Sequence, residues 1–566
     1  MPNEGGTTEL QKEPEPSSAR LDSWKEIAVY LKRDPRTVRR WERLEGLPVH
    51  RHLHGKKGSV YAFAREIDTW LVGRREPDGA AQLPLGYVPQ AVACTDSATL
   101  QRAPSTRPLV IAVLPLRDLT SDLEGSRFAD GLTEELVLEL GQCCPQRLRV
   151  IASTSAMQYK QSPKNIRDIG KELGADYIIE GNIRRVGQRV RLAARLIMAR
   201  DQAHVWADSY EVQLPPIFAI QQTLARELAN SLVSELEVKP SHSRPRVFAW
   251  NNEAYTRYLE GKSYFLPTDE DIKKKLESLY LAIRQDPRFA RTYAEIALVN
   301  FPRLYRDDPP IMLLEIIREN ALQALNLDPK LADGHVGAAA YQLFLAWNWP
   351  EAEKSSRRAI ELNPSSVRAH NMRAAYHLVV GERAQAIEEL DQAHQLNPRF
   401  HEHGLLTSLF TYFARDYDSA IKRCQPLVQE DPPLPVAQGL LGLCYAMKGS
   451  YPSALSSCGH VTEPGGGPIG KAALACAVYN LAGERDSAEH LLQELVAAQA
   501  NRYVRSYYLA LASAGLGNDQ ETLNWLEKAF EQHDPFLVFL KVDPRFEPIS
   551  GHPHFRKLIR RIGLHG

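Results

Sequence analysis

The side chains with the clearest chemistry in this sequence are the arginines and lysines gathered within residues 20–75. This stretch holds 14 Lys and Arg against 7 Asp and Glu, an excess of +7 in a chain whose formal net charge is zero. A guanidinium group matches guanine edges and phosphates, and a lysine meets phosphate as a point charge. A positive excess confined to one small module indicates a polyanionic partner for that module.

Two short helices should position the first group of these cations. Ser23 with Glu26 three residues later forms a capping box, so a helix should begin at Trp24. Asp34 followed by Pro35 is a second helix start, with the aspartate as N-cap and the proline at the first helical position. Only three residues separate the two helices, which is the spacing of a helix-turn-helix.

A β-hairpin should carry the remaining cations. Residues 49–63 alternate in polarity and turn around Gly55 and Gly58, with Lys56 and Lys57 at the tip. A cationic hairpin end suits the phosphate backbone, and arginines on the second helix suit readout in the major groove. The pattern therefore predicts a small winged helix-turn-helix.

This stretch resembles the MerR-type winged helix and the related excisionase-like domains. The matching residues are WKEIA at 24–28, TVRRWE at 37–42, GLP at 46–48 and SVY at 59–61. In that family the second helix and the wing contact double-stranded DNA. The corresponding side chains here are Arg36, Thr37, Arg39, Arg40, Arg43, Lys56 and Lys57. No long dimerisation helix follows Leu71, so the oligomeric state stays open, and a solvated basic face is the alternative interpretation.

Length and composition indicate the class of the whole chain. At 566 residues it should hold three or more domains, and 44% hydrophobic with 24% charged residues is ordinary for a soluble protein. Residues 1–19 are polar, so we expect a disordered lead-in. The sequence contains no run of eighteen apolar residues, so no membrane helix is expected. Seven scattered cysteines favour a cytoplasmic protein. Residues 76–107, rich in Pro, Gly, Ala and Ser, predict a linker.

Strands and helices alternate through residues 108–238, which predicts a mixed α/β sandwich. Strands are expected at 109–114, 149–152, 177–184, 190–198 and 204–210, and helices at 125–140, 164–173 and 217–236. The region resembles the TolB amino-terminal-like, FlgO-like domain. That resemblance rests on segments such as IAVLPL at 111–116, FADGLTEEL at 128–136 and LGADYIIEGNIRR at 173–185. It implies a ligand-binding or interaction role with no settled catalytic activity.

Residues 249–535 read as an all-α tetratricopeptide solenoid, followed by a capping tail at 536–566. Prolines recur after Asp or Asn at spacings of 42, 35, 34 and 34, and a period of 34 is the tetratricopeptide signature. They are Pro287, Pro329, Pro364, Pro398 and Pro432. Small residues fall in register with them, at Ala352, Ala359, Ala386, Ala393, Ala420, Gly442 and Ala454. We expect seven or eight helix pairs, with an insertion in the first proline interval. The last pairs should be degenerate and end near 481–483 and 516–517. The concave face of the array should bind protein.

Four patterns that could suggest catalysis or metal binding have simpler interpretations. The GGGPIGK run at 465–471 has the spacing of a phosphate-binding loop, but it stands between repeat helices and lacks the Mg²⁺-binding hydroxyl. His50, His52 and His54 could ligate a metal, though phosphate contact or a solvated face suits a wing better. Glu134 and Glu135 are neighbours on a helix, so their side chains point apart and should not share a catalytic task. The adjacent cysteines at 143–144 should mark the end of that helix.

These features predict a multidomain, non-enzymatic, cytoplasmic bacterial regulator of transcription that needs no cofactor or metal. The winged helix would bind double-stranded DNA, the α/β domain would sense or transmit, and the repeats would recruit a protein. A signalling scaffold whose winged helix binds protein is the alternative. A cyclase-type enzyme is a third hypothesis, which rests on domain association alone.

Overall fold

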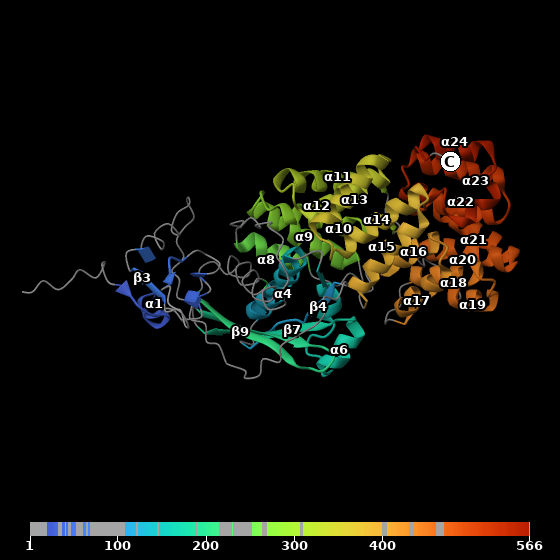
Figure 1. The fold of residues 1–566 in the computed structure, drawn as a ribbon. Coiled ribbons are helices and arrows are strands. Elements are labelled where there is room, and N and C mark those ends of the chain that lie inside the picture. The colour runs from blue at the N-terminus through green and yellow to red at the C-terminus, as the bar shows by residue number, and fades with distance from the viewer. Residues whose placement is uncertain are drawn as a thin grey trace, which may run out of the picture. The chain divides into compact units, whose positions relative to one another are not determined.

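The computed structural model falls into two compact units, Met1–Leu85 and Gly86–Gly566 (Figure 1). The residues that the structure describes are 20–31, 37–39, 41–42, 47–51, 60–63, 66–67, 108–119, 123–143, 147–186, 189–213, 229, 252–262, 269–305, 310–398, 404–429, 435–459 and 469–564.

The first unit combines a helix with a small sheet. Helix α1 (Trp24–Tyr30) begins where the capping box predicts: the Ser23 side chain accepts from the Glu26 amide, and the Asp22 amide donates to the Glu26 carboxylate at 2.8 Å. Residues 37–39 and 41–42 are also helical. The strands run in the order β1-β3-β2, and the predicted hairpin is β2 paired antiparallel with β3. Their bounds are β1 (Arg20–Leu21), β2 (His50–Arg51) and β3 (Val60–Phe63).

These pieces share one apolar core, which explains why so short a stretch can fold. Apolar side chains from α1, the second helical segment and β3 are buried together in this core. The buried members are Ile27, Ala28, Val38, Leu47, Ala62 and Ile67, with Trp24 and Trp41 packed against them.

The second unit begins with a mixed sheet whose path is β6-β4-β7-β8-β9, with β5 pairing to β7. Strand β4 is parallel to β6 and β7, while β7, β8 and β9 are antiparallel neighbours. The five predicted strands are confirmed; the short β5 was not predicted. The bounds are β4 (Leu109–Val113), β5 (Arg117–Asp118), β6 (Leu148–Val150), β7 (Tyr177–Val186), β8 (Arg189–Met198) and β9 (His204–Gln213).

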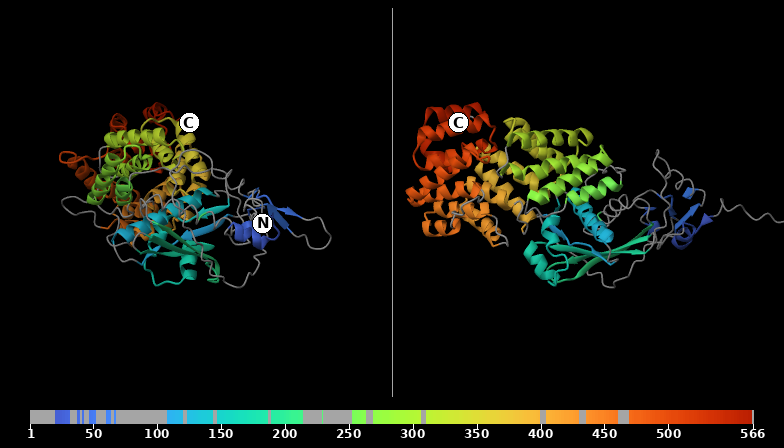
Figure 2. Two further views of the ribbon diagram at one scale, coloured as in Figure 1. Left: turned by 90° about the vertical axis from the view of Figure 1, so that its left-hand side faces the viewer. Right: turned by 180° about the vertical axis from the view of Figure 1, so that it is seen from behind.

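Helices cover both faces of this sheet (Figures 1 and 2). Helix α4 (Leu123–Cys143) packs on one face through a cluster that includes Leu132 and Leu136, and it ends at a cysteine as expected. Helix α6 (Ile166–Leu173), capped by the Asn165 side chain, covers the other face, next to the unpredicted α5 (Ser153–Met157). The helix predicted at 217–236 lies outside the described residues apart from Ala229, which is helical and buried.

The rest of the second unit is a tetratricopeptide-like solenoid. Within the described residues its helices pack as eight pairs, in agreement with the expected seven or eight. The pairs are α8 (Asn252–Gly261) with α9 (Asp269–Gln285), α10 (Ala290–Asn300) with α11 (Pro310–Leu327), α12 (Ala332–Phe344) with α13 (Trp349–Leu362), α14 (Val367–Val380) with α15 (Arg383–Leu396), α16 (Gly404–Phe413) with α17 (Tyr417–Val428), α18 (Pro435–Met447) with α19 (Tyr451–Cys458), α20 (Ile469–Ala482) with α21 (Arg485–Ala498), and α22 (Ser506–Gly515) with α23 (Asp519–Glu531).

The predicted repeat register matches this packing. The first four prolines each stand two residues after the second helix of a pair, and the predicted alanines are almost fully buried; Pro432 lies outside the described residues. A Cβ on Gly442 would lie 2.7 Å from the Cys458 sulfur, so only glycine fits that helix crossing. The expected insertion contains the 3-10 helix η2 (Pro302–Tyr305).

One detail of the repeat prediction is wrong. The glycine signals near 481–483 and 516–517 do not end pairs; they end α20 and α22, which are the first helices of the last two pairs. Gly483 and Gly517 both take positive φ there, as a helix C-terminus favours, so the same residue serves within a pair as well as between pairs. Within the described part of the chain, no helix has the length and apolar character that a membrane crossing needs.

Candidate nucleic-acid interface and the domain junction

The first unit presents two of the seven predicted DNA contacts within its described residues. Arg39 is exposed, and its guanidinium carbon lies 5.3 Å from the centre of the Trp24 ring on α1. Thr37 is half-buried, and Val38 between them is fully buried. One side of this helical segment therefore packs into the core through Val38, while Arg39 lies on the outside. The cation–π contact with Trp24 holds the Arg39 side chain in place.

The other five predicted contacts are not placed by the structure. Arg36, Arg40, Arg43, Lys56 and Lys57 lie outside the described residues. The stem of the hairpin that carries the two lysines is described: His50 pairs with Tyr61, and Arg51 pairs with Val60.

The histidine pattern in this hairpin has a local explanation at its first member. The His50 Nε2 atom lies 2.6 Å from a Glu66 carboxylate oxygen, and its ring stacks on Tyr61 at 5.2 Å. His52 and His54 lie outside the described residues. No group of three or more potential metal ligands occurs among the residues that the structure describes.

The glycine-rich run before Lys471 lies between two repeat helices, as expected from its position. Residues 460–468 are outside the described set, and Lys471 stands in the first turn of α20, which follows α19 in the solenoid. A phosphate-binding loop instead connects a strand to a helix.

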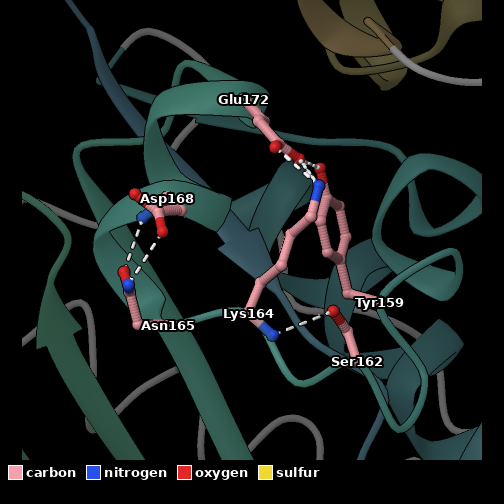
Figure 3. Close-up of polar contacts among 6 residues, drawn as sticks. All are labelled: Tyr159, Ser162, Lys164, Asn165, Asp168 and Glu172. Carbon is pink, nitrogen blue, oxygen red and sulfur yellow. Dashed lines mark hydrogen bonds and ion pairs between the residues drawn. The ribbon is translucent and has the colours of Figure 1, made fainter.

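A polar cluster at the corner between α5 and α6 is a further candidate (Figure 3). The Tyr159 hydroxyl donates to Glu172 at 2.6 Å, and the Lys164 ammonium donates to the same carboxylate at 2.6 and 2.9 Å. Because these groups bind one another, the cluster ties the loop before α6 to the end of that helix and is best described as structural.

The most elaborate polar site joins the α/β domain to the solenoid. Two adjacent glutamates on α4 each bind separate partners. Glu134 lies 3.1 Å from the Lys262 ammonium. Glu135 accepts hydrogen bonds from the Tyr255 hydroxyl at 3.0 Å and from Arg291 at 2.5 Å. The sequence carries no local signal for this role, because the partners lie 120 or more residues away.

Ion pairing shifts the pKa of two buried groups at or near this junction. Burial disfavours the charged Arg291 guanidinium, but the Glu135 carboxylate outweighs that effect and raises its pKa above the ordinary value. Burial likewise would raise the pKa of Glu295 on α10, yet its pair with Arg368 lowers that pKa to about 2. Arg291 and Glu295 therefore remain charged at neutral pH.

A second set of contacts fixes the sheet edge to the loops of the solenoid. The Ala152 amide donates to the Leu396 carbonyl at 2.8 Å, and the Val150 amide donates to the Ser365 hydroxyl at 3.1 Å. The solenoid thus satisfies backbone groups next to β6, an end strand of the sheet path, which would otherwise be available for unwanted pairing.

Comparisons with known proteins each cover part of the chain. Residues 107–230 match the family model of the HilA/YgeH-like transcriptional regulator, second domain. Putative adenylate cyclase 3 of Rhizobium meliloti (strain 1021) is 30% identical over 243 residues, which are 42% of this chain and 40% of that protein. Hsp70-Hsp90 organizing protein 1 of Glycine max is 28% identical over 105 residues, 19% of this chain and 18% of that protein. The chain thus spans less than half the length of either relative.

Among solved structures, a tetratricopeptide repeat protein from Parabacteroides merdae ATCC 43184 has a TM-score of 0.30 and 16% identity, covering 48% of this chain and all of that one. Lipoprotein GNA1162 from Neisseria meningitidis has a TM-score of 0.18 and 15% identity, covering 22% and 99%.

Proposed function

We propose that this chain is a non-enzymatic, cytoplasmic transcriptional regulator that binds double-stranded DNA through its first unit. The main support is the match of residues 107–230 to a domain of a transcriptional regulator, in a chain that also carries a basic module at residues 20–75. The MerR-like identity of the module and the TolB-like identity of the α/β domain are part of the same proposal.

In the proposed mechanism, the exposed Arg39 and its basic neighbours on the second helix contact base edges in the major groove. The lysines at the hairpin tip contact phosphates and so set affinity without reading sequence. The packing of Val38 into the core supports this division, because it fixes which side of the helix faces outward.

The solenoid is proposed to bind a protein, which makes regulation of the bound promoter conditional on a partner. Similarity to Hsp70-Hsp90 organizing proteins supports an interaction role for the repeats. The similarity to a putative adenylate cyclase favours a cyclase-type enzyme as the second candidate.

The deciding experiment measures binding of the full chain to genomic duplex fragments across a salt series. We expect binding whose affinity falls steeply with salt, with each neutralised phosphate contributing roughly −0.9 to the log–log slope. Salt-independent binding, or none at low salt, would contradict the regulator and favour the scaffold. A cyclase would reveal itself by conversion of ATP to cyclic AMP.

A further inference from the structure

The C-terminal segment after α23 carries a nine-residue pattern that differs from the 34-residue period of the repeats. A capping residue and a proline recur at Asp534-Pro535, Asp543-Pro544 and His552-Pro553. Each capping side chain accepts a hydrogen bond from the amide two residues later, at 3.0, 3.1 and 3.2 Å. Three short helical turns follow, η3 (Pro535–Phe539), η4 (Pro544–Ile549) and α24 (Pro553–Arg561).

Each turn buries apolar side chains at the same two places in the pattern. None of the six is more than 2% exposed: Leu537, Leu540, Phe546, Ile549, Phe555 and Leu558. All belong to the same continuous core as the helices of the solenoid. We call residues 535–564 the strap.

The strap lies against the inner side of the solenoid. Successive first helices of the pairs pack closely on one another, whereas successive second helices do not, so the first helices line the inside of the curve. Turn η3 packs on α12 and α14, and η4 packs on α22. In Figures 1 and 2 the C-terminal helices accordingly lie beside the middle pairs.

An aromatic side chain anchors η3 in this position. Phe539 is fully buried, and its ring stacks on Phe413 of α16 at 4.7 Å, with Phe410 and Phe344 at 5.5 and 6.0 Å. One side chain thus joins the third and fifth pairs, which are about 70 residues apart in the chain.

Polar contacts tie the residue just before the strap and the end of the strap to other parts of the solenoid. The Arg505 side chain, fully buried before α22, donates to the Leu304 carbonyl of η2 and lies 3.6 Å from Asp534. At the other end, the Trp349 indole donates to the Gly563 carbonyl at 3.0 Å. Separating the buried Arg505 and Asp534 would leave two charged groups in the core without a counter-ion, which is costly.

We propose that the strap is a built-in ligand of the solenoid: it permanently occupies the inner face of the third to fifth pairs and closes the array. A protein partner then has to dock outside the inner face of these three pairs. The proposal rests on contacts within the second unit and is independent of DNA binding by the first.

Hydrogen exchange on the full chain tests this directly. We expect amides of η3 and η4 to be protected as strongly as those of α14, because a permanent ligand opens only when the surrounding repeats open. A strap that exchanged at least tenfold faster than α14 would be a mobile lid, and the proposal would be overturned.

A variant pair tests the coupling. Phe539→Ala should accelerate exchange roughly 100-fold in the strap and equally in α12 and α16, since the cavity weakens their shared core. Tyr280→Ala, at an aromatic that is 41% exposed on α9, is the matched control and should change little. Faster exchange confined to the strap would contradict a shared core; should Phe539→Ala fail to fold, the exchange pattern of the unmodified chain still decides.

Discussion

At the residue scale, Arg39 is the predicted DNA contact whose placement is best defined. If it reads a base, Arg39→Ala should weaken binding to the preferred duplex by about 1–3 kcal/mol and relax specificity at one position. Arg200→Ala, on an exposed arginine of the α/β domain, provides the control and should leave the affinity unchanged. Fluorescence anisotropy with preferred and scrambled duplexes measures both.

Lys56→Ala supplies the complementary test, because a wing lysine that meets phosphate should weaken all sequences about equally. A change in sequence preference for Lys56→Ala, together with normal binding by Arg39→Ala, would reverse the assignment of reading helix and wing.

The buried thiols of the solenoid allow a second prediction at this scale. Burial raises the pKa of Cys424 and Cys476 to about 12 and that of Cys458 to about 11. At pH 8 we therefore expect alkylation in the folded protein to be roughly 1,000-fold slower than in urea, where the pKa is about 8.5. Leu481→Cys, at an exposed position, should react at the unfolded rate.

The same raised pKa values fix a direction for stability. The contribution of these protonated thiols is fully present below about pH 8.5 and is lost as the pH rises toward 12. Urea denaturation measured between pH 9 and pH 11 should therefore give falling midpoints. A rising midpoint would contradict the burial of these thiols.

At the scale of elements, the junction between α4 and the first solenoid helices is the most sensitive point. Glu135→Gln keeps the shape of the side chain but leaves the Arg291 charge without its counter-ion, so it should lower the free energy of unfolding by about 3 kcal/mol. Glu489→Gln breaks an exposed pair on α21 and should cost less than about 0.5 kcal/mol. Urea denaturation compares the two, and equal losses would show that the junction contributes no special stability.

The features of the fold that the sequence predicts are those encoded by residues close together in the chain. The start of α1 at Ser23, the strands of the sheet and the proline register of the repeats follow from periodicity and capping, which are properties of neighbouring residues. The pairing of Glu135 with Arg291 joins positions 156 residues apart, and the strap joins the C-terminal segment to the third pair. Such contacts leave no trace in a local pattern.

The failed details have the same origin. Gly483 and Gly517 end helices, as glycines often do, but a left-handed C-terminus looks alike within a pair and between pairs. The short β5 and α5 are too brief to establish a period, so only their packing against the sheet reveals them.

At the scale of the whole molecule, the junction changes what removal of residues 250–566 should do. The first unit has its own apolar core, so the shortened chain should keep its DNA affinity and salt dependence. The α/β domain, however, would lose the partners of Glu134 and Glu135 and uncover the edge at Val150, and an uncovered strand edge promotes association. We therefore expect the shortened protein to bind DNA yet to aggregate and to lose regulation in a reporter assay. Light scattering beside a DNA-binding measurement separates the two effects, and a monomeric, well-folded product would show that the α/β domain is independent of the solenoid.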